Sequence, residues 1–331
     1  MRIVVTGAAG FIGSNLVRAL NARGETNILA VDNLSRSEKF RNLVDCEIDD
    51  YLDKDHFRAA LDAGSFDGEI SAILHQGACS DTMQADGRYM MDNNFQYSSD
   101  LLRYCQSESV PLIYASSASV YGAGPVFKEK RENEKPLNVY GYSKFLFDQT
   151  VRRRWEEKGA QVVGLRYFNV YGPRETHKGR MASVALHCFN QFRETGKVSL
   201  FEGSGGYDAG EQRRDFISVD DVVRVNLYFL DNPAKSGIFN CGTGASQTFN
   251  QVAVATINAV RCAQGREALT DVAMKAQGMI EYGPFPPGLK DKYQSFTQAN
   301  LDDLRGAKYS TPFSDVHTGV TRYVDWLLAN R

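Results

Sequence analysis

The sequence predicts an α/β fold, a doubly wound parallel sheet followed by a smaller C-terminal lobe. Three observations support this prediction: an N-terminal glycine loop, short apolar runs that alternate with longer helical patterns, and the loss of that alternation after Asn169. The loop residues Gly7, Gly10 and Gly13 lie between an apolar run and an amphipathic stretch. A strand, a tight turn and a helix in this order are typical of the Rossmann-type fold, which binds dinucleotides.

The apolar, β-branched runs of the first half have the length of buried strands. They are residues 2–5, 28–31, 72–75, 112–115 and 162–165. Between them, residues 12–20, 90–107 and 145–158 have the length and polarity of helices that cover a sheet, with right-handed crossovers. The carboxyl ends of the strands then lie at one edge, where such sheets bind their ligands.

The same patterns divide the chain into two parts. Residues 1–170 are predicted to form the dinucleotide-binding Rossmann domain, to which a later segment, about 210–245, returns. Residues 171–331 are predicted to be mainly the substrate-binding lobe, with helices near 183–194 and 249–260. The stretches 202–210 and 283–292 are rich in glycine or proline and are expected to be loops that close over a ligand.

Composition and charge argue against several classes of protein. The 331 residues include 38 basic and 40 acidic side chains, a net charge of −2, so no long-range attraction to nucleic acid or to an anionic membrane is expected. The six cysteines are scattered without a Cys-x-x-Cys spacing, which argues against a disulfide framework and a zinc site. No metal is therefore expected. Without a signal peptide or a long apolar stretch, a soluble cytoplasmic protein is expected.

The residues after the second predicted strand bear on the choice of dinucleotide. Asp32 lies about 20 positions beyond the glycine loop, where an acidic residue commonly binds the adenosine ribose and favours NAD. Asn33, Arg36 and Lys39 follow it, and such side chains can receive a ribose 2′-phosphate and favour NADP. The alternative is that the two cations belong to an exposed loop. NADP is the expected cofactor, and NAD is the alternative.

A tyrosine and a lysine indicate the reactive group. Tyr140 and Lys144 share one face of a predicted helix start, so the ammonium is expected to lower the pKa of the phenol toward neutrality. Tyr140 is thereby a candidate base toward an alcohol. Ser116 and Ser117 follow the run 112–115, where a hydroxyl can hydrogen-bond a substrate oxygen. The alternatives are a packed helix pair and serines in a turn.

With these motifs the sequence resembles the extended short-chain dehydrogenase/reductase family, which includes nucleotide-sugar epimerases. The motifs are Thr6-Gly7-x-x-Gly10-x-x-Gly13, Ser117-Ala118-Ser119-Val120-Tyr121-Gly122, Tyr140-x-x-x-Lys144, Arg166-Tyr167-Phe168-Asn169-Val170-Tyr171-Gly172-Pro173-Arg174, Arg214-Asp215-Phe216 and Asn240-x-Gly242-Thr243-Gly244. Three narrower segments, 90–94, 134–140 and 177–179, are similar to the branch of that family that acts on ADP-heptose.

The resemblance implies an isomerase that inverts C6″ of ADP-D-glycero-D-manno-heptose, with tightly bound NADP, to supply heptose for the lipopolysaccharide inner core. It also implies a cytosolic homo-oligomer, a pentamer, with no nucleic-acid or membrane partner. Direct deprotonation of a carbinol carbon faces a prohibitive barrier. Transient oxidation to a ketone, with return of the hydride to its other face, is therefore the expected route. Tyr140 would take the hydroxyl proton, and Lys178 is implied as the second acid/base.

Carried over position by position, the resemblance implies three sets of site residues. The catalytic residues are Tyr140, Lys178, Lys144 and Ser117. The cofactor contacts are Gly7, Gly10, Phe11, Ile12, Gly13, Asp32, Asn33, Lys39, Lys54, Gln76, Gly77, Ala78, Cys79, Ser80, Asn93, Lys144, Val170 and Lys178. The substrate contacts are Ser117, Asn169, Arg180, His187, Phe201, Glu202, Gly203, Ser204, Arg214 and Tyr293. The alternatives are a packed helical histidine for His187 and a solvated loop lysine for Lys178.

The sequence departs from the family pattern at several positions, and three other functions are alternatives to the one that the resemblance implies. Gln76 stands where relatives often have an acid, Arg180 replaces a small residue, and the segment 202–214 is longer than expected. A 4-epimerase needs the same tyrosine, and Lys178 is the discriminating residue. A dehydratase is disfavoured because residues 118–119 are Ala-Ser, where its Asp-Glu pair would stand. A non-catalytic dinucleotide sensor is the alternative from another class.

Overall fold

The computed structural model describes residues 1–154, 159–286 and 293–330. The chain forms two compact units. Unit 1 comprises Met1–Tyr167, Val222–Cys241 and Asp302–Tyr309, and unit 2 comprises Phe168–Asp221, Gly242–Leu301 and Ser310–Arg331. The chain therefore leaves the first unit after its sixth strand and re-enters it within a helix.

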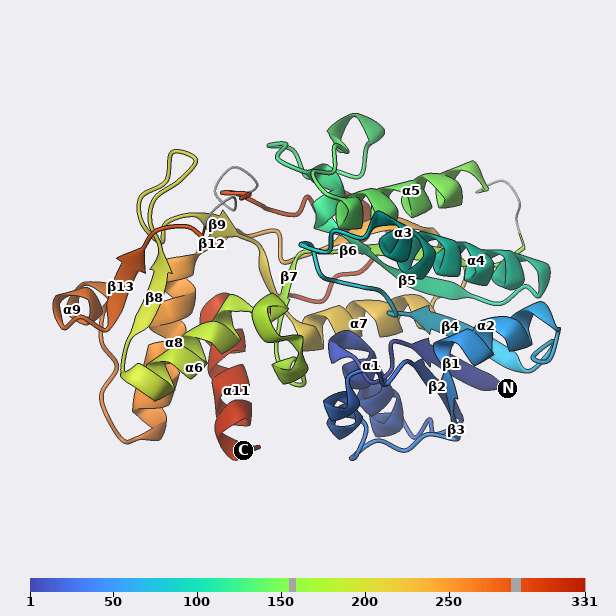
Figure 1. Ribbon diagram of the computed structural model, residues 1–331, viewed down its shortest axis with the longest axis horizontal. Helices are drawn as coiled ribbons and strands as arrows, with labels where there is room; N and C mark the ends of the chain where they lie inside the picture. Colours follow the sequence, from blue (N-terminus) through green and yellow to red (C-terminus); the bar gives the residue numbers. More distant parts are fainter. Residues whose placement is uncertain (155–158, 287–292, 331) are drawn as a thin grey trace. The chain divides into compact units, whose positions relative to one another are not determined.

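Within the described residues, unit 1 contains a seven-stranded parallel sheet (Figure 1). Its strands are β1 (Arg2–Thr6), β2 (Ile28–Asp32), β3 (Asp50–Asp53), β4 (Ile70–His75), β5 (Leu112–Ser117), β6 (Val162–Tyr167) and β11 (Gly237–Cys241). Their order in the sheet is β11-β6-β5-β4-β1-β2-β3, with every pair parallel. The predicted doubly wound parallel sheet is confirmed.

The helices of unit 1 connect these strands. They are α1 (Phe11–Ala22), η1 (Ser37–Asn42), α2 (Lys54–Asp62), α3 (Gly87–Met90), η2 (Met91–Gln96), α4 (Tyr97–Ser107), η3 (Ala118–Tyr121), η4 (Arg131–Asn133), α5 (Val139–Arg153), most of α7 (Val219–Leu230) and α10 (Asp302–Gly306). The strand order runs one way from β1 to β3 and the other way from β4 to β6. Right-handed crossovers then place α1 on one face and α4 and α5 on the other. The direction reverses between β1 and β4, where doubly wound sheets bind ligands.

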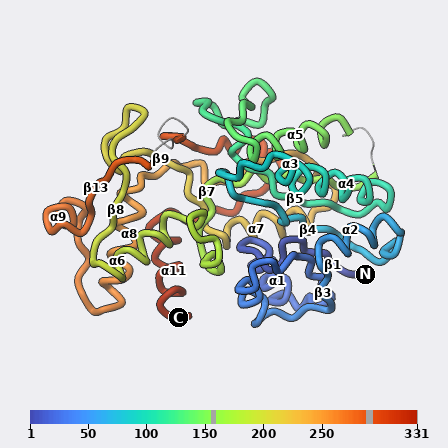
Figure 2. The backbone as a smooth tube through the Cα atoms, in the orientation of Figure 1, coloured from blue at the N-terminus to red at the C-terminus, as the bar shows by residue number. Residues whose placement is uncertain are grey.

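Unit 2 combines short strand pairs with longer helices (Figure 2). Two strand pairs are parallel, β7 (Asn169–Tyr171) with β10 (Phe216–Ser218) and β8 (Val198–Phe201) with β13 (Ile280–Gly283). One is antiparallel, β9 (Arg213–Arg214) with β12 (Gln247–Thr248). The helices are η5 (Thr176–Met181), α6 (Val184–Thr195), α8 (Phe249–Ala263), α9 (Asp271–Ala276) and α11 (Val316–Ala329). A core cluster that includes Phe189, Val252 and Val320 joins α6, α8 and α11, so these helices form the scaffold that carries the loops.

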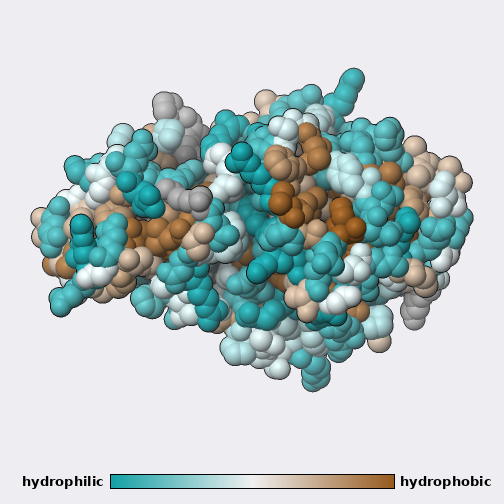
Figure 3. Space-filling model, turned by 90° about the horizontal axis from the view of Figure 1, so that it is seen from below, coloured by the Kyte–Doolittle hydropathy of each residue, from teal (hydrophilic) through white to brown (hydrophobic). Residues whose placement is uncertain are grey.

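Hydrophilic side chains cover most of the face shown in Figure 3, and hydrophobic residues gather there in separate patches. This mixture is usual, since polar side chains cannot cover the whole surface of a folded chain. Among the helices in the described part of the chain, none combines the length and apolar character needed to cross a bilayer.

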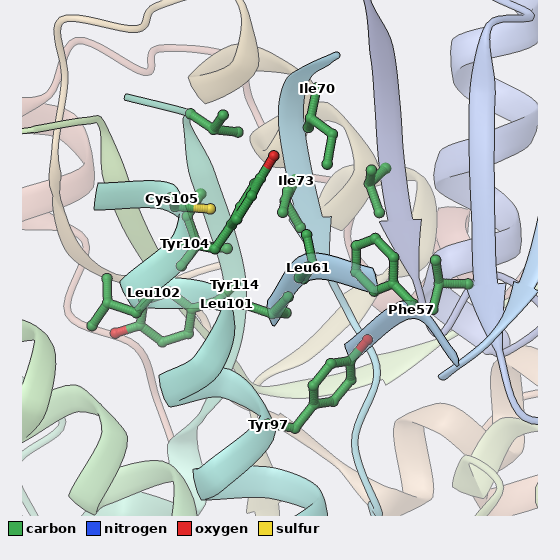
Figure 4. Close-up of a cluster of buried hydrophobic side chains, with 14 of the residues drawn as sticks. Phe57, Leu61, Ile70, Ile73, Tyr97, Leu101, Leu102, Tyr104, Cys105 and Tyr114 are labelled. Atoms are coloured by element: carbon green, nitrogen blue, oxygen red, sulfur yellow. The ribbon is translucent and has the colours of Figure 1, made fainter. Parts of the chain in front are cut away.

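The main apolar cluster of unit 1 lies between the sheet and α2, α4 and α5 (Figure 4). Phe57 and Leu61 enter it from α2, and Tyr97 and Leu101 from α4, all less than 9% exposed. Residues three and four apart on these helices face the same way, so each helix buries one stripe against the strands. This packing fixes the three helices on one face of the sheet.

Candidate active site

The glycine loop joins β1 to α1, as the sequence predicts. A Cβ atom on Gly13 would lie 2.1 Å from the carbonyl oxygen of Gly7, so only glycine allows the first turn of α1 to pack this closely on the loop. Gly10 is the N-cap of α1, and Phe11 and Ile12 begin the helix. The backbone amides of the first turn and the positive end of the helix dipole therefore lie beside a loop without side chains at Gly7 and Gly10, an arrangement that suits a pyrophosphate.

Asp32 ends β2 beside this loop and is bonded on both oxygens. Oδ2 accepts a hydrogen bond of 2.9 Å from the backbone N–H of Ala9. Oδ1 forms an ion pair with Nζ of Lys39, which also donates to the carbonyl oxygen of Asn33 at 3.0 Å. The negative charge of Asp32 is thus compensated by a neighbouring ammonium group, and this end of the strand can accept an additional anion.

Gln76, Gly77, Ala78, Cys79 and Ser80 form the loop after β4. The amide of Asn94 clamps the loop, because its Oδ1 accepts from the backbone N–H of Cys79 at 2.8 Å and its Nδ2 donates to the Cys79 carbonyl at 3.0 Å. The side chain of Gln76 is hydrogen-bonded to Tyr167 (3.0 Å) and Asn226 (3.3 Å), so both ends of its amide have partners within unit 1.

Asn93 and Asn94 lie in a π-helical turn, η2, within the stretch predicted as one regular helix over 90–107. Nζ of Lys54 donates to Oδ1 of Asn93 at 3.0 Å. Both asparagines of this turn face inward, 7% and 1% exposed, and π-helical turns of this kind are frequent at functional sites. Asn94 was not among the predicted site residues, and the apolar periodicity of the segment gives no signal of the π turn.

Tyr140, Lys144 and Ser117 come together in unit 1. Helix α5 begins at Val139, capped by Asn138, whose Oδ1 accepts from the N–H of Gly141 at 2.8 Å. Ser117, the last residue of β5, is close enough to the phenol of Tyr140 to affect its pKa. Lys144 is 4% exposed, and its Nζ donates to the carbonyl oxygen of Ala115 at 2.8 Å. The structure thus brings the three residues of the predicted group to the carboxyl end of one strand.

The expectation that Lys144 lowers the pKa of Tyr140 is wrong for this structure. Burial raises the pKa of Tyr140, and the nearby Ser117 hydroxyl opposes this only in part. Burial also lowers the pKa of Lys144 to about 8, although the charge of Asp148 raises it. The physical reason is that the ammonium is directed at the Ala115 carbonyl, and removal of both groups from water disfavours their charged forms.

The two predicted serines have different roles. Ser116 Oγ donates to Asp148 Oδ2 at 3.0 Å, and Tyr114 donates to its Oδ1 at 2.9 Å. Asp148 also accepts from Nε of Arg166 at 2.9 Å, and both ionic side chains are fully buried. Arg166 pairs in turn with Glu134. This network holds α5 against β5 and β6. Ser117 takes no part in it, and its Oγ donates to Ser119 Oγ and accepts from the Ser119 N–H, at 3.1 Å each.

In unit 2, Arg214 is buried in an aromatic cluster. Its Cζ lies 4.9 Å from the centre of the Tyr293 ring. Phe201 stacks on Phe285 with ring centres 4.6 Å apart, and Phe285 lies 4.9 Å from Tyr293. Burial lowers the pKa of Arg214 to about 10, although Tyr293 opposes this. Among the described residues, no hydrogen-bond acceptor reaches its Nη1. A buried guanidinium with an open donor beside aromatic rings suits a nucleotide diphosphate.

Lys178 lies in η5, on a segment held by Glu175. The Glu175 carboxylate is fully buried and accepts from both the N–H and the hydroxyl of Ser183, at 2.6 Å each. Burial lowers the pKa of Lys178, and the Glu175 charge opposes this in part. Arg180, in the same segment, is exposed. The lysine is therefore a partly buried cation on a fixed turn, unlike a solvated surface lysine.

The remaining predicted substrate residues and the predicted cofactor contact Val170 also lie in unit 2. Asn169 and Val170 are in β7, His187 is in α6, and Glu202, Gly203 and Ser204 follow β8. Part of the predicted loop 283–292 falls at 287–292, outside the described residues. Ser204 Oγ lies 3.1 Å from Ser295 Oγ, so the segment after β8 lies beside the one that carries Tyr293.

Comparison with known proteins identifies this arrangement. Residues 3–242 match the NAD dependent epimerase/dehydratase family. The chain is 64% identical over 325 residues to the ADP-L-glycero-D-manno-heptose-6-epimerase of Thiobacillus denitrificans, and the match covers 98% of each chain. The resemblance stated from the motifs is confirmed.

Two solved structures are also similar to the chain. The ADP-L-glycero-D-manno-heptose-6-epimerase of Helicobacter pylori matches with a TM-score of 0.81 and 29% identity, over 99% of this chain and 96% of that one. The UDP-glucose 4-epimerase of Thermus thermophilus, in complex with NAD, matches with a TM-score of 0.78 and 25% identity over the whole of both chains. Both epimerases share the fold described above.

Proposed function

Because the chain belongs to the NAD dependent epimerase/dehydratase family, we propose that it inverts C6″ of ADP-D-glycero-D-manno-heptose to give ADP-L-glycero-D-manno-heptose. The route is transient oxidation of the C6″ alcohol to a ketone, followed by return of the hydride to the other face. The names and close similarity of the Thiobacillus and Helicobacter enzymes support this substrate. The product would supply heptose for the lipopolysaccharide inner core.

The observation that carries the proposal is the Ser117, Tyr140 and Lys144 group at the end of β5. Such a group can hold an alcohol oxygen between two hydroxyls and exchange its proton with the phenol oxygen of Tyr140. Because burial raises the pKa of Tyr140, the phenolate must be favoured by charges that ligands bring to the site. Lys144, held by the Ala115 carbonyl at the same end of β5, is positively charged below pH about 8.

The cofactor is a nicotinamide dinucleotide, and we propose NADP as the natural one. The bound dinucleotide would accept the C6″ hydride and return it. The glycine loop and the start of α1 would hold its pyrophosphate, and the clamped loop after β4 would lie along it. Lys39, already paired with Asp32, and Arg36 on the same segment would bind the 2′-phosphate. NAD is the alternative, as in the Thermus structure.

Lys178 is proposed as the second acid/base and Arg214 as the diphosphate ligand. An epimerisation presents the ketone oxygen at two positions, and one tyrosine hydroxyl serves one of them. The pKa of Lys178 is lowered by burial, which makes proton exchange at Nζ easier near neutral pH. In this division, unit 1 binds the dinucleotide, and Arg214, Tyr293 and Phe201 of unit 2 bind the ADP group.

We further propose a cytoplasmic homo-oligomer, a pentamer. The cysteines support a reducing compartment, because all six are free thiols in the described structure. Size-exclusion chromatography with light scattering tests the assembly. A mass near that of one 36.9 kDa chain would contradict it.

The function is tested by incubating the purified protein with ADP-D-glycero-D-manno-heptose, without added reductant, and following C6″ by NMR. Conversion to the L-glycero epimer is expected. No conversion, with a dinucleotide shown to be bound, would refute the substrate assignment. Parallel reactions with UDP-glucose test the 4-epimerase alternative, which the Thermus relative represents.

A further inference from the structure

A closed loop in unit 2 carries three of the proposed substrate contacts. Residues 202–212 leave β8 after Phe201 and return to β9. Gly210 N–H donates to the Phe201 carbonyl at 3.2 Å, and Gln212 Nε2 donates to the Glu202 carbonyl at 2.6 Å. These bonds close the base of the loop. Its ends are therefore close together, as in compact Ω-type loops, whose positions depend on what anchors them.

Asn250, in the first turn of α8, anchors this loop. Its Nδ2 donates to the Ala209 carbonyl at 3.2 Å and to Oε1 of Glu211 at 2.5 Å, and its backbone N–H donates to the Gly210 carbonyl at 3.0 Å. Three consecutive loop residues are thus bonded to one buried residue, 3% exposed. The helix start is itself fixed by a capping box between Thr248 and Gln251.

The other end of the same amide is bonded to the strand pair that carries Phe201. Oδ1 of Asn250 accepts from the hydroxyl of Tyr282 at 2.9 Å. Tyr282 lies in β13, opposite Leu200 of β8. Asparagine offers a donor and an acceptor on one short side chain. It therefore joins the loop, α8 and the β8–β13 pair at one point, which alanine and aspartate cannot do.

Gly210 completes the anchor. Its φ is +70°, which side chains rarely allow, and a Cβ atom there would lie 2.3 Å from Oδ1 of Asn250. The loop can approach the amide this closely only because the residue is glycine. Asn250 and Glu211 also border a cavity of about 400 Å³, so water can reach an altered side chain there and a variant need not unfold.

We propose that Asn250 is a positioning residue for the substrate, which acts by holding loop 202–212 and thereby Glu202, Gly203 and Ser204. This inference rests on the proposed function, since those residues are its substrate contacts. It concerns the segment that the sequence predicts to be longer than the family pattern.

The test compares Asn250→Asp with Asn258→Asp. Asn258 is the control because it lies on the same helix and its Nδ2 donates to Leu269 at 3.0 Å, in the segment between α8 and α9. Asn250→Asp removes the donor and places a carboxylate against Glu211. We expect KM for ADP-heptose to rise about tenfold with kcat nearly unchanged. We also expect faster hydrogen exchange across 202–212. The control should change neither quantity.

Adding Glu211→Gln to Asn250→Asp supplies a hydrogen-bond donor from the opposite side. The double variant is expected to have a KM much closer to that of the wild type. Tyr282→Phe is a milder second variant if Asn250→Asp does not fold, and it should raise KM in the same direction. Unchanged exchange in the loop, or equal rises in KM for the Asn250 and Asn258 variants, would overturn the anchor. Wild-type protein without turnover would refute the proposed function instead, and the exchange data would still decide the anchor.

Discussion

Replacement of Asp148 by asparagine tests whether the buried network behind the active site sets both stability and the pKa of Lys144. The carboxylate accepts hydrogen bonds from Tyr114, Ser116 and Arg166 at 2.9 to 3.0 Å. Asp148 and Arg166 are both fully buried. The amide of asparagine has one oxygen and no charge, so at least one donor and part of the Arg166 charge lose their partner.

The expected loss of stability follows from this geometry. Removing one partner of a buried ion pair typically costs 3–5 kcal/mol. Glu134 still pairs with Arg166, which favours the lower end, about 3 kcal/mol. For a chain of 331 residues that corresponds to a fall in Tm of roughly 4 °C. The control is Asp231→Asn, which removes an exposed pair with Arg23 and should cost less than about 1 kcal/mol.

The same variant changes the electrostatics of catalysis. The charge of Asp148 raises the pKa of Lys144 against the larger effect of burial, which lowers it to about 8. Without that charge the pKa falls further, so the alkaline loss of kcat should move to lower pH. Thermal unfolding and a pH profile of turnover measure the two effects. A Tm equal to that of the control would refute the stabilising role of Asp148. An unchanged alkaline side of the pH profile of kcat would show that the pKa of Lys144 does not depend on Asp148.

The remaining predictions concern single side chains. Tyr140→Phe and Lys178→Met should each lower turnover by about 10²–10⁴ while a dinucleotide still binds by fluorescence titration; near-normal rates would remove that residue from the mechanism. Lys39→Ala should weaken NADP more than NAD, and equal losses in Kd would contradict the 2′-phosphate assignment. Burial lowers the pKa of Lys144 from 10.5 to about 8, so the charged lysine opposes folding below pH 8, and this opposition fades as pH rises toward 10.5. Lys144→Met should therefore be inactive yet more stable at pH 7 by up to about 3 kcal/mol in urea denaturation; a less stable variant would contradict this.

The sequence predicts those features of unit 1 that depend on local patterns. β5 continues to Ser117, and α5 begins at Val139, close to where the Tyr140 motif implies a helix start. The predicted end of that helix, Lys158, lies outside the described residues. The strands β3 and β11 were not predicted. β3 is only Asp50–Asp53 and half exposed, and β11 follows a long excursion of the chain.

The sequence could not predict which neighbours form hydrogen bonds with each buried polar group. Asp148 stands four residues after Lys144 on the same helix, and that spacing was available as a signal. Its partners come from β5 and β6, however, so the network becomes visible only when the strands are adjacent. The prediction that the pKa of Tyr140 is lowered was wrong for a related reason. Spacing places an ammonium on the same helical face, but burial and the Ala115 carbonyl decide the outcome.

The buried cations separate the residues that hold the fold from those available to ligands. Burial lowers the pKa of Arg166, but Asp148 and Glu134 outweigh it, so the net pKa is raised and the charge is structurally compensated. For Lys144 and Arg214 burial prevails, and their pKa values fall to about 8 and about 10. Among the described residues, Lys144 donates to a backbone carbonyl and Nη1 of Arg214 has no acceptor, so neither cation is paired with a carboxylate there. Folding alone does not favour such groups, since neutral side chains of similar size would be more stable there. Their presence, one in each unit, is explained if a dinucleotide and a nucleotide diphosphate supply the missing negative charge, and both pKa values should then rise when those ligands bind.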